Sequence, residues 1–164
     1  MKKNQYFKII LVALFLVIIG CKKTEIESKD VEKAKPDVSE IKSLIIAAGE
    51  NFVIALNRGD STAVANCYTK DAKMMQPNGI AVIGRSDILK NMGQWIKSES
   101  PTLSMKTIDV WADGDLAVAE EEWTISNKEG KILDNGKSLE LFKMEEGKWL
   151  LYRDCFNSNI PSTK

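Results

Sequence analysis

The chain has 164 residues, of which 44% are apolar and 28% charged, enough for one domain with a hydrophobic core. Its 23 basic residues equal its 23 acidic residues, so no excess of positive charge indicates a nucleic-acid partner. It contains no histidine, which excludes Ser-His and Cys-His nucleophile pairs and nearly every transition-metal site. Any general acid or base must therefore be Asp, Glu, Lys, Tyr or Cys, and we expect no metal or cofactor.

Residues 1–20 have the pattern of a secretory signal peptide. A positive start at Lys2 and Lys3 precedes an unbroken apolar run from Ile9 to Ile19, too short to span a membrane comfortably. The run ends in Gly20 and Cys21, and this junction resembles the bacterial lipobox. The resemblance implies lipidation of Cys21 and a place in the bacterial cell envelope, on the periplasmic side or the surface. The alternative is an uncleaved N-terminal anchor helix.

Residues 21–36 are rich in Lys and Glu and hold few large apolar side chains. Such a segment cannot bury enough surface to offset the entropy of ordering it, so it predicts a flexible tether. The folded domain is expected over residues 37–159, followed by a disordered tail at 160–164.

Three helices are predicted in the first half of the domain. The first begins at the Asp37 cap, carries apolar residues at helical spacing as far as Leu56, and ends at Gly59. A shorter helix then runs to about Tyr68. After two short apolar runs at 72–76 and 80–83, separated by a turn, a third helix follows Gly84.

The second half reads as strands and turns. Strands are predicted at about 103–110, 116–126, 137–144 and 147–159, with a polar connection at 127–136. The apolar parity slips near Lys106 and Thr107, which predicts a β-bulge that bends the sheet. Together these elements predict an α+β fold in which a curved antiparallel sheet wraps around three helices.

The last strand carries charges among apolar residues. With a strict period of two, one face holds Trp149, Leu151, Arg153, Cys155 and Asn157, and the other holds Leu150, Tyr152, Asp154 and Phe156. Cys155 lies far from Cys67 in sequence. The two cysteines either form a disulfide or are buried thiols.

Several motifs then resemble one family. They are Asn57-Arg58-Gly59-Asp60, Tyr68 with Asp71-Ala72, Gly84-Arg85, and Gly147-Lys148-Trp149 running on to Asp154 and Phe156-Asn157-Ser158. The pattern is similar to SnoaL-like, ketosteroid isomerase-related domains of the nuclear transport factor 2-like (cystatin-like) superfamily, over nearly all of 37–159. The resemblance implies a conical cavity between sheet and helices.

In related enzymes a carboxylate in that cavity abstracts a proton beside a carbonyl, and the resemblance places Asp154 in this role. Tyr68 is the candidate hydrogen-bond partner, or else a core residue at a helix end. Alternatively, Asp154 pairs with Arg153, Arg85 or a lysine and is structural. The candidate ligand-binding residues are Met75, Trp95, Glu121, Trp123, Arg153 and Asn157, with Glu121 paired to Arg153 as one possibility. Core packing is the alternative for both tryptophans.

Three functions follow from these features. The first is a lipid-anchored protein that binds a small apolar or amphipathic molecule. The second is an isomerase, cyclase or dehydratase that uses Asp154 as acid and base. The third is a dimeric interaction module with a filled cavity, because members of this superfamily often pair through the outer face of the sheet. Leu150, Tyr152 and Phe156 would supply that surface, and a homodimer is the expected state. We rank binding first.

Overall fold

The structure is a computed structural model that describes residues 37–161. The predicted signal peptide, the lipidated Cys21 and the tether lie outside the described residues. Within residues 37–161 no helix is both long and apolar enough to cross a membrane.

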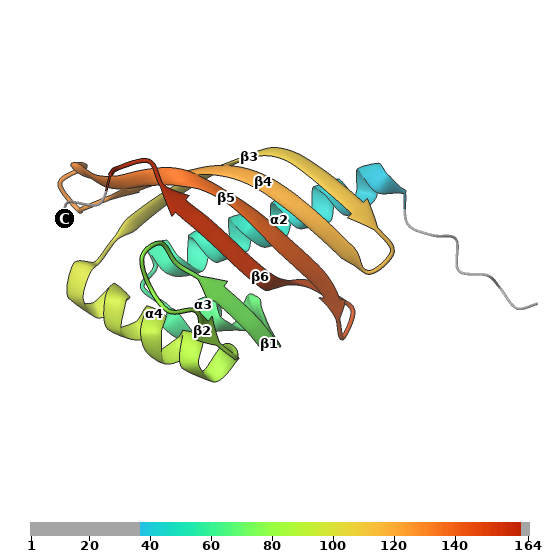
Figure 1. The fold of residues 1–164 in the computed structure, drawn as a ribbon, viewed down its shortest axis with the longest axis horizontal. Helices are drawn as coiled ribbons and strands as arrows, with labels where there is room; N and C mark the ends of the chain where they lie inside the picture. The colour runs from blue at the N-terminus through green and yellow to red at the C-terminus, as the bar shows by residue number, and fades with distance from the viewer. Residues whose placement is uncertain (1–36, 162–164) are drawn as a thin grey trace, which may run out of the picture. The chain divides into compact units, whose positions relative to one another are not determined.

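The elements follow in the order helix, helix, hairpin, helix and four-stranded meander (Figure 1). The helices are α2 (Val38–Asn57), α3 (Ser61–Asn66) and α4 (Arg85–Glu99). The strands are β1 (Tyr68–Met75), β2 (Val82–Ile83), β3 (Thr102–Asp113), β4 (Leu116–Ser126), β5 (Ile132–Glu145) and β6 (Lys148–Ser158).

Local sequence explains where the first two helices begin and how they meet. The Asp37 side chain accepts a hydrogen bond from the backbone N–H of Ser39 and caps α2. Asp60 caps α3 in the same way, by accepting from the N–H of Ala63 at 2.9 Å. Between them Gly59 takes a φ of 73°, a left-handed conformation that favours glycine.

Six strands form one sheet in the order β2-β1-β6-β5-β4-β3. The helices lie on its inner, concave side, where α2 packs on β3, β4 and β6, and α4 packs on α3, β1 and β2 (Figure 1). The predicted α+β fold is therefore confirmed, with one difference. β1 pairs with β6 in parallel, so the sheet is mixed rather than wholly antiparallel.

Two predicted boundaries were wrong. The second helix ends at Asn66, and Tyr68 instead opens β1, where it pairs with Leu151 of β6. Strand β5 begins at Ile132 rather than at residue 137, because the far end of β4 requires hydrogen-bonding partners and Ile132 pairs with Ser126. The predicted polar connection is correspondingly shorter.

Register shifts occur in four of the strand pairings, and two of them concern β3 and β6. The predicted bulge in β3 is confirmed, and its extra residue is Ile108, between Thr107 and Asp109. A second bulge was not predicted. In β6, Leu151 pairs with Phe142 and Arg153 pairs with Leu141, so Tyr152 is the extra residue.

The bulge at Tyr152 overturns the predicted faces of β6. Trp149 and Leu151 face the helices as expected, but beyond Tyr152 it is Asp154 that is buried. Cys155 and Asn157 are exposed instead. A strict period of two fails here because the extra residue turns every later side chain to the opposite face.

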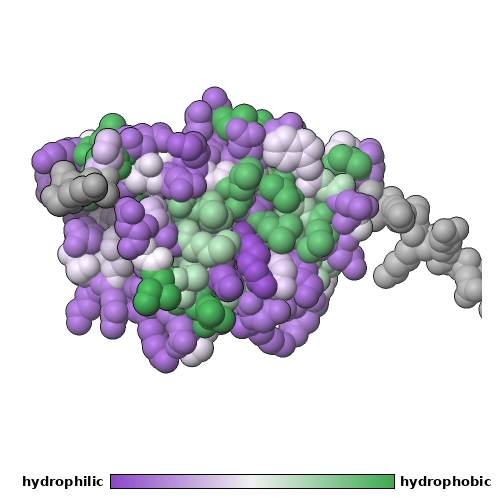
Figure 2. All heavy atoms as spheres, viewed as in Figure 1, coloured by the Kyte–Doolittle hydropathy of each residue, from purple (hydrophilic) through white to green (hydrophobic). Residues whose placement is uncertain are grey.

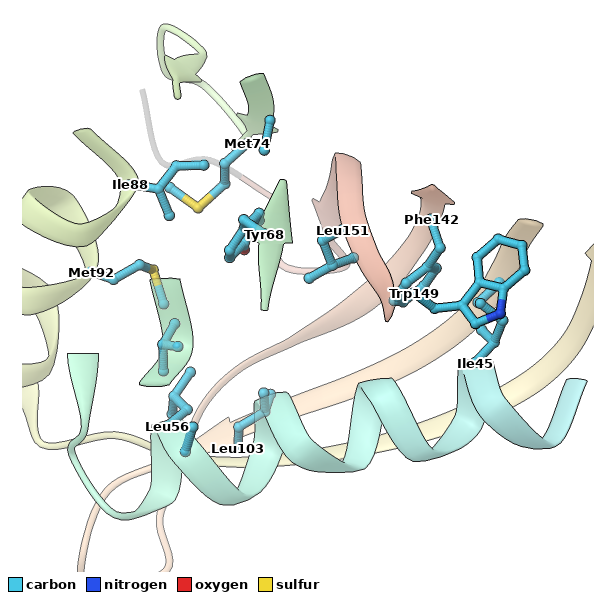
Figure 3. Packing of buried hydrophobic residues seen from close by; sticks show 14 of the residues in the cluster. Ile45, Leu56, Tyr68, Met74, Ile88, Met92, Leu103, Phe142, Trp149 and Leu151 are labelled. Atoms are coloured by element: carbon cyan, nitrogen blue, oxygen red, sulfur yellow. The ribbon is translucent and has the colours of Figure 1, made fainter. Parts of the chain in front are cut away.

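The core is filled at one end of the sheet and hollow at the other. Figure 3 shows Ile45, Phe142 and Trp149 gathered at one end of α2, each at most 7% exposed. Toward the other end, Met74 and Met92 are buried but line a cavity. Tyr68 lies between these two groups (Figure 3).

The outer face of the sheet carries apolar side chains at its centre, surrounded by polar ones (Figure 2). Leu139 is 57% exposed, and Leu150 and Tyr152 are half-buried. Phe156, expected on this face, instead lines the cavity on the inner side, because the Tyr152 bulge turns it inward.

Candidate functional site

A cavity of about 850 Å³ lies between the sheet and the helices. Its walls are mostly apolar and aromatic: Phe52, Leu56, Met74, Met92, Trp95, Leu103, Met105, Trp123, Ile125 and Phe156. Three acids, Asp134, Glu140 and Asp154, and the hydroxyl-bearing Tyr68 also line it. A hollow of this size with a few polar groups is typical of a small-molecule site.

Tyr68 and Asp154 form a short, buried polar contact at the cavity. The Tyr68 hydroxyl donates to Asp154 Oδ2 at 2.6 Å, and the two side chains are 0% and 6% exposed. Tyr68 is the first residue of β1, and β1 runs parallel to β6, which brings residues 86 positions apart together. The ring of Phe52 packs edge-on against Tyr68 and fixes its orientation.

Glu140 lies beside Asp154 as its cross-strand partner on β5. It is 8% exposed, and its Oε1 accepts from the Ser138 hydroxyl at 3.3 Å. Glu121, on β4, is wholly buried, and its Oε1 accepts from the Thr107 hydroxyl at 3.0 Å. We call Glu121, Glu140, Asp154 and Tyr68 the acidic cluster.

No hydrogen bond joins Glu121 to Glu140, and Glu121 Oε2 is buried without a hydrogen-bond partner among the described residues. Burial, together with the neighbouring charges of Asp154 and Glu121, favours the protonated form of Glu140.

Burial sets the protonation of the whole cluster. It raises the pKa of Asp154 to about 6, against the opposing effect of the hydrogen bond from Tyr68. It raises the pKa of Glu140 well above the usual range, and the nearby charges of Asp154 and Glu121 add to this. Burial also raises the pKa of Glu121, and it raises that of Tyr68, with Asp154 contributing.

No cation offsets these acids among the described residues. Arg153 was considered as a partner for Asp154 and for Glu121, but its guanidinium lies 3.6 Å from the centre of the Tyr152 ring and donates to backbone carbonyls. Arg85 donates to the Tyr68 carbonyl oxygen and to Glu145. None of the three alternative pairings, Arg153 with Asp154, Arg153 with Glu121 and Arg85 with Asp154, is found. Neighbouring residues of a strand lie on opposite faces, so Arg153 does not lie beside Asp154 on one face of β6. Arg153 does not meet Glu121 because the extra residue Tyr152 turns it to the outer face.

The structure brings together some of the sequence-predicted site residues. Asp154, Tyr68, Trp95 and Trp123 all line the cavity, and Glu121 lies buried beside it in the acidic cluster. Met75, Arg153 and Asn157 are not among the lining residues. Met75 pairs with the exposed Cys155, and Asn157 is itself exposed.

Sequence reasoning missed Glu140 and Asp134. Glu140 shares the period-two parity of Ser138 and the buried Phe142, and that parity was a usable signal for an inward carboxyl. Asp134 fell within the predicted polar connection, but it belongs to β5 and accepts from the Ser158 hydroxyl at 2.6 Å.

Neither a metal site nor a disulfide is present in the described part of the chain. No three His, Cys, Asp or Glu side chains of residues 37–161 are grouped to hold a metal ion. Cys67 and Cys155 are free thiols. Cys67 is partly buried, which raises its pKa to about 11, whereas Cys155 is exposed rather than buried as the alternative reading required.

The raised pKa of Asp154 predicts an unusual pH dependence of stability. The folded state holds the proton of Asp154 more tightly than the unfolded state does. The resulting contribution to the free energy of unfolding is therefore fully present below pH 3.8 and is lost as the pH rises through about 6. Between pH 4 and 7 the free energy of unfolding of the protein, relative to that of Asp154→Asn, should fall by about 2 kcal/mol. Urea unfolding of both proteins at several pH values measures the difference.

Asp109→Asn is the matched control for this experiment. A hydrogen bond from Lys42 lowers the pKa of Asp109. The free energy of unfolding of the protein, relative to that of Asp109→Asn, should therefore rise as the pH increases, opposite to the change for Asp154→Asn. A difference between the protein and Asp154→Asn that is flat with pH would contradict the assignment of a raised pKa to Asp154.

Comparison with known proteins supports the architecture. Residues 50–152 match the family model described as a SnoaL-like domain. None of the curated proteins compared with the chain matches it.

Solved structures share the fold. A ketosteroid isomerase-like protein from Erwinia carotovora atroseptica aligns with a TM-score of 0.63 and 24% identity, over 74% of this chain and 98% of that one. A domain of unknown function with a cystatin-like fold from Nostoc punctiforme gives 0.66 and 16%, over 73% and 77%. A protein of the NTF2-like family from Streptomyces avermitilis gives 0.65 and 15%, over 75% and 99%. Since the family match spans more than half of the sequence, the chain belongs to the SnoaL-like domain family.

Proposed function

We propose that the protein binds a small, mostly apolar molecule in the cavity and orients its polar end on Asp154 and Glu140. The observation that carries this proposal is the cavity of about 850 Å³, apolar along its walls and polar where the two acids lie. The aromatic side chains border the hollow rather than filling it, which favours ligand binding over an interaction module with a filled cavity. The absence of a cation on Asp154 among the described residues argues against a purely structural ion pair.

A neutral, environment-sensitive dye tests the binding proposal. Nile red should bind with increased fluorescence because the cavity walls are apolar. Asn91→Trp places an indole in the cavity from α4, and it should weaken dye binding by about tenfold or more, since the volume is no longer available. Fluorescence titration measures the dissociation constant.

Lys90→Trp is the control for Asn91→Trp, because Lys90 is the neighbouring residue on α4 and points to solvent. It should leave dye binding unchanged. Equal dye binding by the protein and Asn91→Trp would place the dye outside the cavity and overturn the proposal. Mass spectrometry of molecules that co-purify with the protein then identifies the natural ligand.

A second function, isomerisation by proton transfer, is favoured by the pKa of Asp154 at about 6 beside a neutral acid. Asp154 as carboxylate would take a proton from the carbon next to a ketone, and the electron pair would move to the carbonyl oxygen. Protonated Glu140 would donate a hydrogen bond to that enolate oxygen, and Asp154 would return the proton two carbons further along. We rank it second because Tyr68 already donates to Asp154, which leaves the base partly engaged.

Conversion of 3-cyclohexenone to 2-cyclohexenone tests the second function. An isomerase should accelerate this reaction above the buffer rate, and Asp154→Asn should lower the rate by about 100-fold or more, since the base is removed. Asp115→Asn, at an exposed turn, should keep the full rate. A rate that is the same in the protein, in Asp154→Asn and in buffer would exclude this chemistry for simple enones.

We also propose that Cys21 is lipidated and anchors the protein to a membrane of the bacterial cell envelope. The charge, apolar run and Gly20-Cys21 junction support this, and all of them are sequence features. Cells grown with a labelled fatty acid should incorporate the label into the protein, and Cys21→Ser should lose it. Label that persists in Cys21→Ser would contradict the site, and Cys67→Ser is the control that should remain labelled.

A further inference from the structure

The described residues that line the cavity carry charge of one sign only. Asp134, Glu140 and Asp154 are acidic, and no lysine or arginine is among the lining residues. The two arginines that were considered as partners of Asp154 point elsewhere, because Arg85 is paired with Glu145 and Arg153 stacks on Tyr152. An anionic ligand would therefore enter without a counter-charge, next to acids that repel it.

Asp154 offers a free acceptor to the cavity. Tyr68 occupies Oδ2, and no hydrogen bond from a described residue reaches Oδ1, although the side chain is only 6% exposed and lines the hollow. Ser138 likewise occupies only Oε1 of Glu140. A buried carboxylate with an unused oxygen and no cation is costly, and a positively charged ligand group would remove that cost.

The walls suit the rest of such a ligand. Trp123 and Phe156 pack edge-to-face with ring centres 6.0 Å apart, and both line the cavity together with Trp95. Aromatic rings accept an apolar body and also attract a cation through their faces. The lining residues Gln76, Asn78 and Gln94 add neutral amides rather than charges.

We propose that the cavity takes a small amphipathic amine, whose ammonium group lies on the free oxygens of Asp154 and Glu140 and whose apolar body packs on Trp95, Trp123 and Phe156. This inference rests on the proposed binding function and adds the chemical class of the ligand. The ammonium supplies the positive charge that the described part of the chain does not place in the acidic cluster.

Three fluorescent probes with one dansyl body separate the effect of charge from that of shape. Dansylcadaverine carries an ammonium, its N-acetyl derivative is neutral, and dansyl-aminocaproate carries a carboxylate. At pH 7.5 the amine should bind at least about tenfold more tightly than the acetylated probe, and the carboxylate most weakly of the three. Fluorescence titration of the whole protein measures the dissociation constants.

Asp154→Asn should reduce the preference for the amine to about threefold or less, while the acetylated probe keeps its affinity. Asp115→Asn, which removes an exposed acid outside the cavity, should preserve the full preference. An equal loss for all three probes in Asp154→Asn would indicate a structural role for Asp154 and would overturn the proposal.

Amine binding should also weaken as the pH falls from 7.5 to 5, because Asp154 becomes protonated. The titratable groups that face Asp154 are Tyr68 from β1, Glu140 from β5 and Glu121 from β4. The residues that line the cavity from α2 and α4 are uncharged. The acetylated probe should show no such dependence, and an amine affinity independent of pH would count against the ion pair.

The outcomes distinguish the two proposals. Equal binding of the three probes, or tightest binding of the carboxylate, would overturn the amine proposal and leave cavity binding intact. If Nile red binds but none of the dansyl probes does, the amine proposal is likewise overturned and cavity binding remains intact. Failure of Nile red and of every dansyl probe would overturn both.

Discussion

One extra residue in β6 controls which side chains face the helices. Before Tyr152 the strand buries Trp149 and Leu151, and after it the strand buries Asp154 and turns Phe156 to the cavity. Without the bulge, Arg153 and Cys155 would occupy the inner face, and the cavity would hold a cation instead of a carboxyl. The stacking of Arg153 on the Tyr152 ring, at 3.6 Å, stabilises the bulged conformation from the outside.

As a consequence of the bulge, three acidic side chains lie close together on the inner face of the sheet. Glu140 pairs with Asp154 across β5 and β6, and the buried Glu121 lies on β4, opposite Ser138 of β5. Three buried carboxyls with no cation among the described residues cost stability, because each must either ionise in a poorly solvated place or hold a proton at neutral pH. Buried groups that cost stability and do not improve core packing are typical of functional sites. The position of these three carboxyls beside a cavity agrees with a functional role.

The position of the hollow follows from how the large side chains are distributed. Phe142, Trp149 and Ile45 fill the end of the sheet where α2 begins (Figure 3). Toward the other end, Trp123 packs against Gly136 of β5, where an added Cβ would come within 2.2 Å of the indole. Because glycine lets the indole lie against the sheet, Trp123 borders the cavity without crossing it. The aromatic residue therefore shapes the site instead of filling it.

Much of the fold could be predicted because it rests on short-range patterns. Helical spacing after the Asp37 cap, the left-handed Gly59 and the parity slip near Thr107 each reflect local chemistry that the structure confirms. The parallel pairing of β1 with β6 depends on contacts far apart in sequence, and no local pattern encodes it. The bulge at Tyr152 also escaped prediction, since apolar and aromatic residues occupy both faces of β6 there.

In the candidate site too, single residues could be predicted from the sequence, whereas contacts between strands far apart in sequence could not. Asp154 was identified by resemblance and Tyr68 by its motif, but their hydrogen bond exists only because of the parallel pairing. The parity of β5 could have placed Glu140 on the inner face, but its position opposite Asp154 depends on the register between two strands, which no single strand reveals. The absence of histidine already required that any acid or base be a carboxyl, tyrosine, lysine or cysteine. In the proposed amine complex, the positive charge beside Asp154 would come from the ligand, because no lysine or arginine of the described residues lines the cavity.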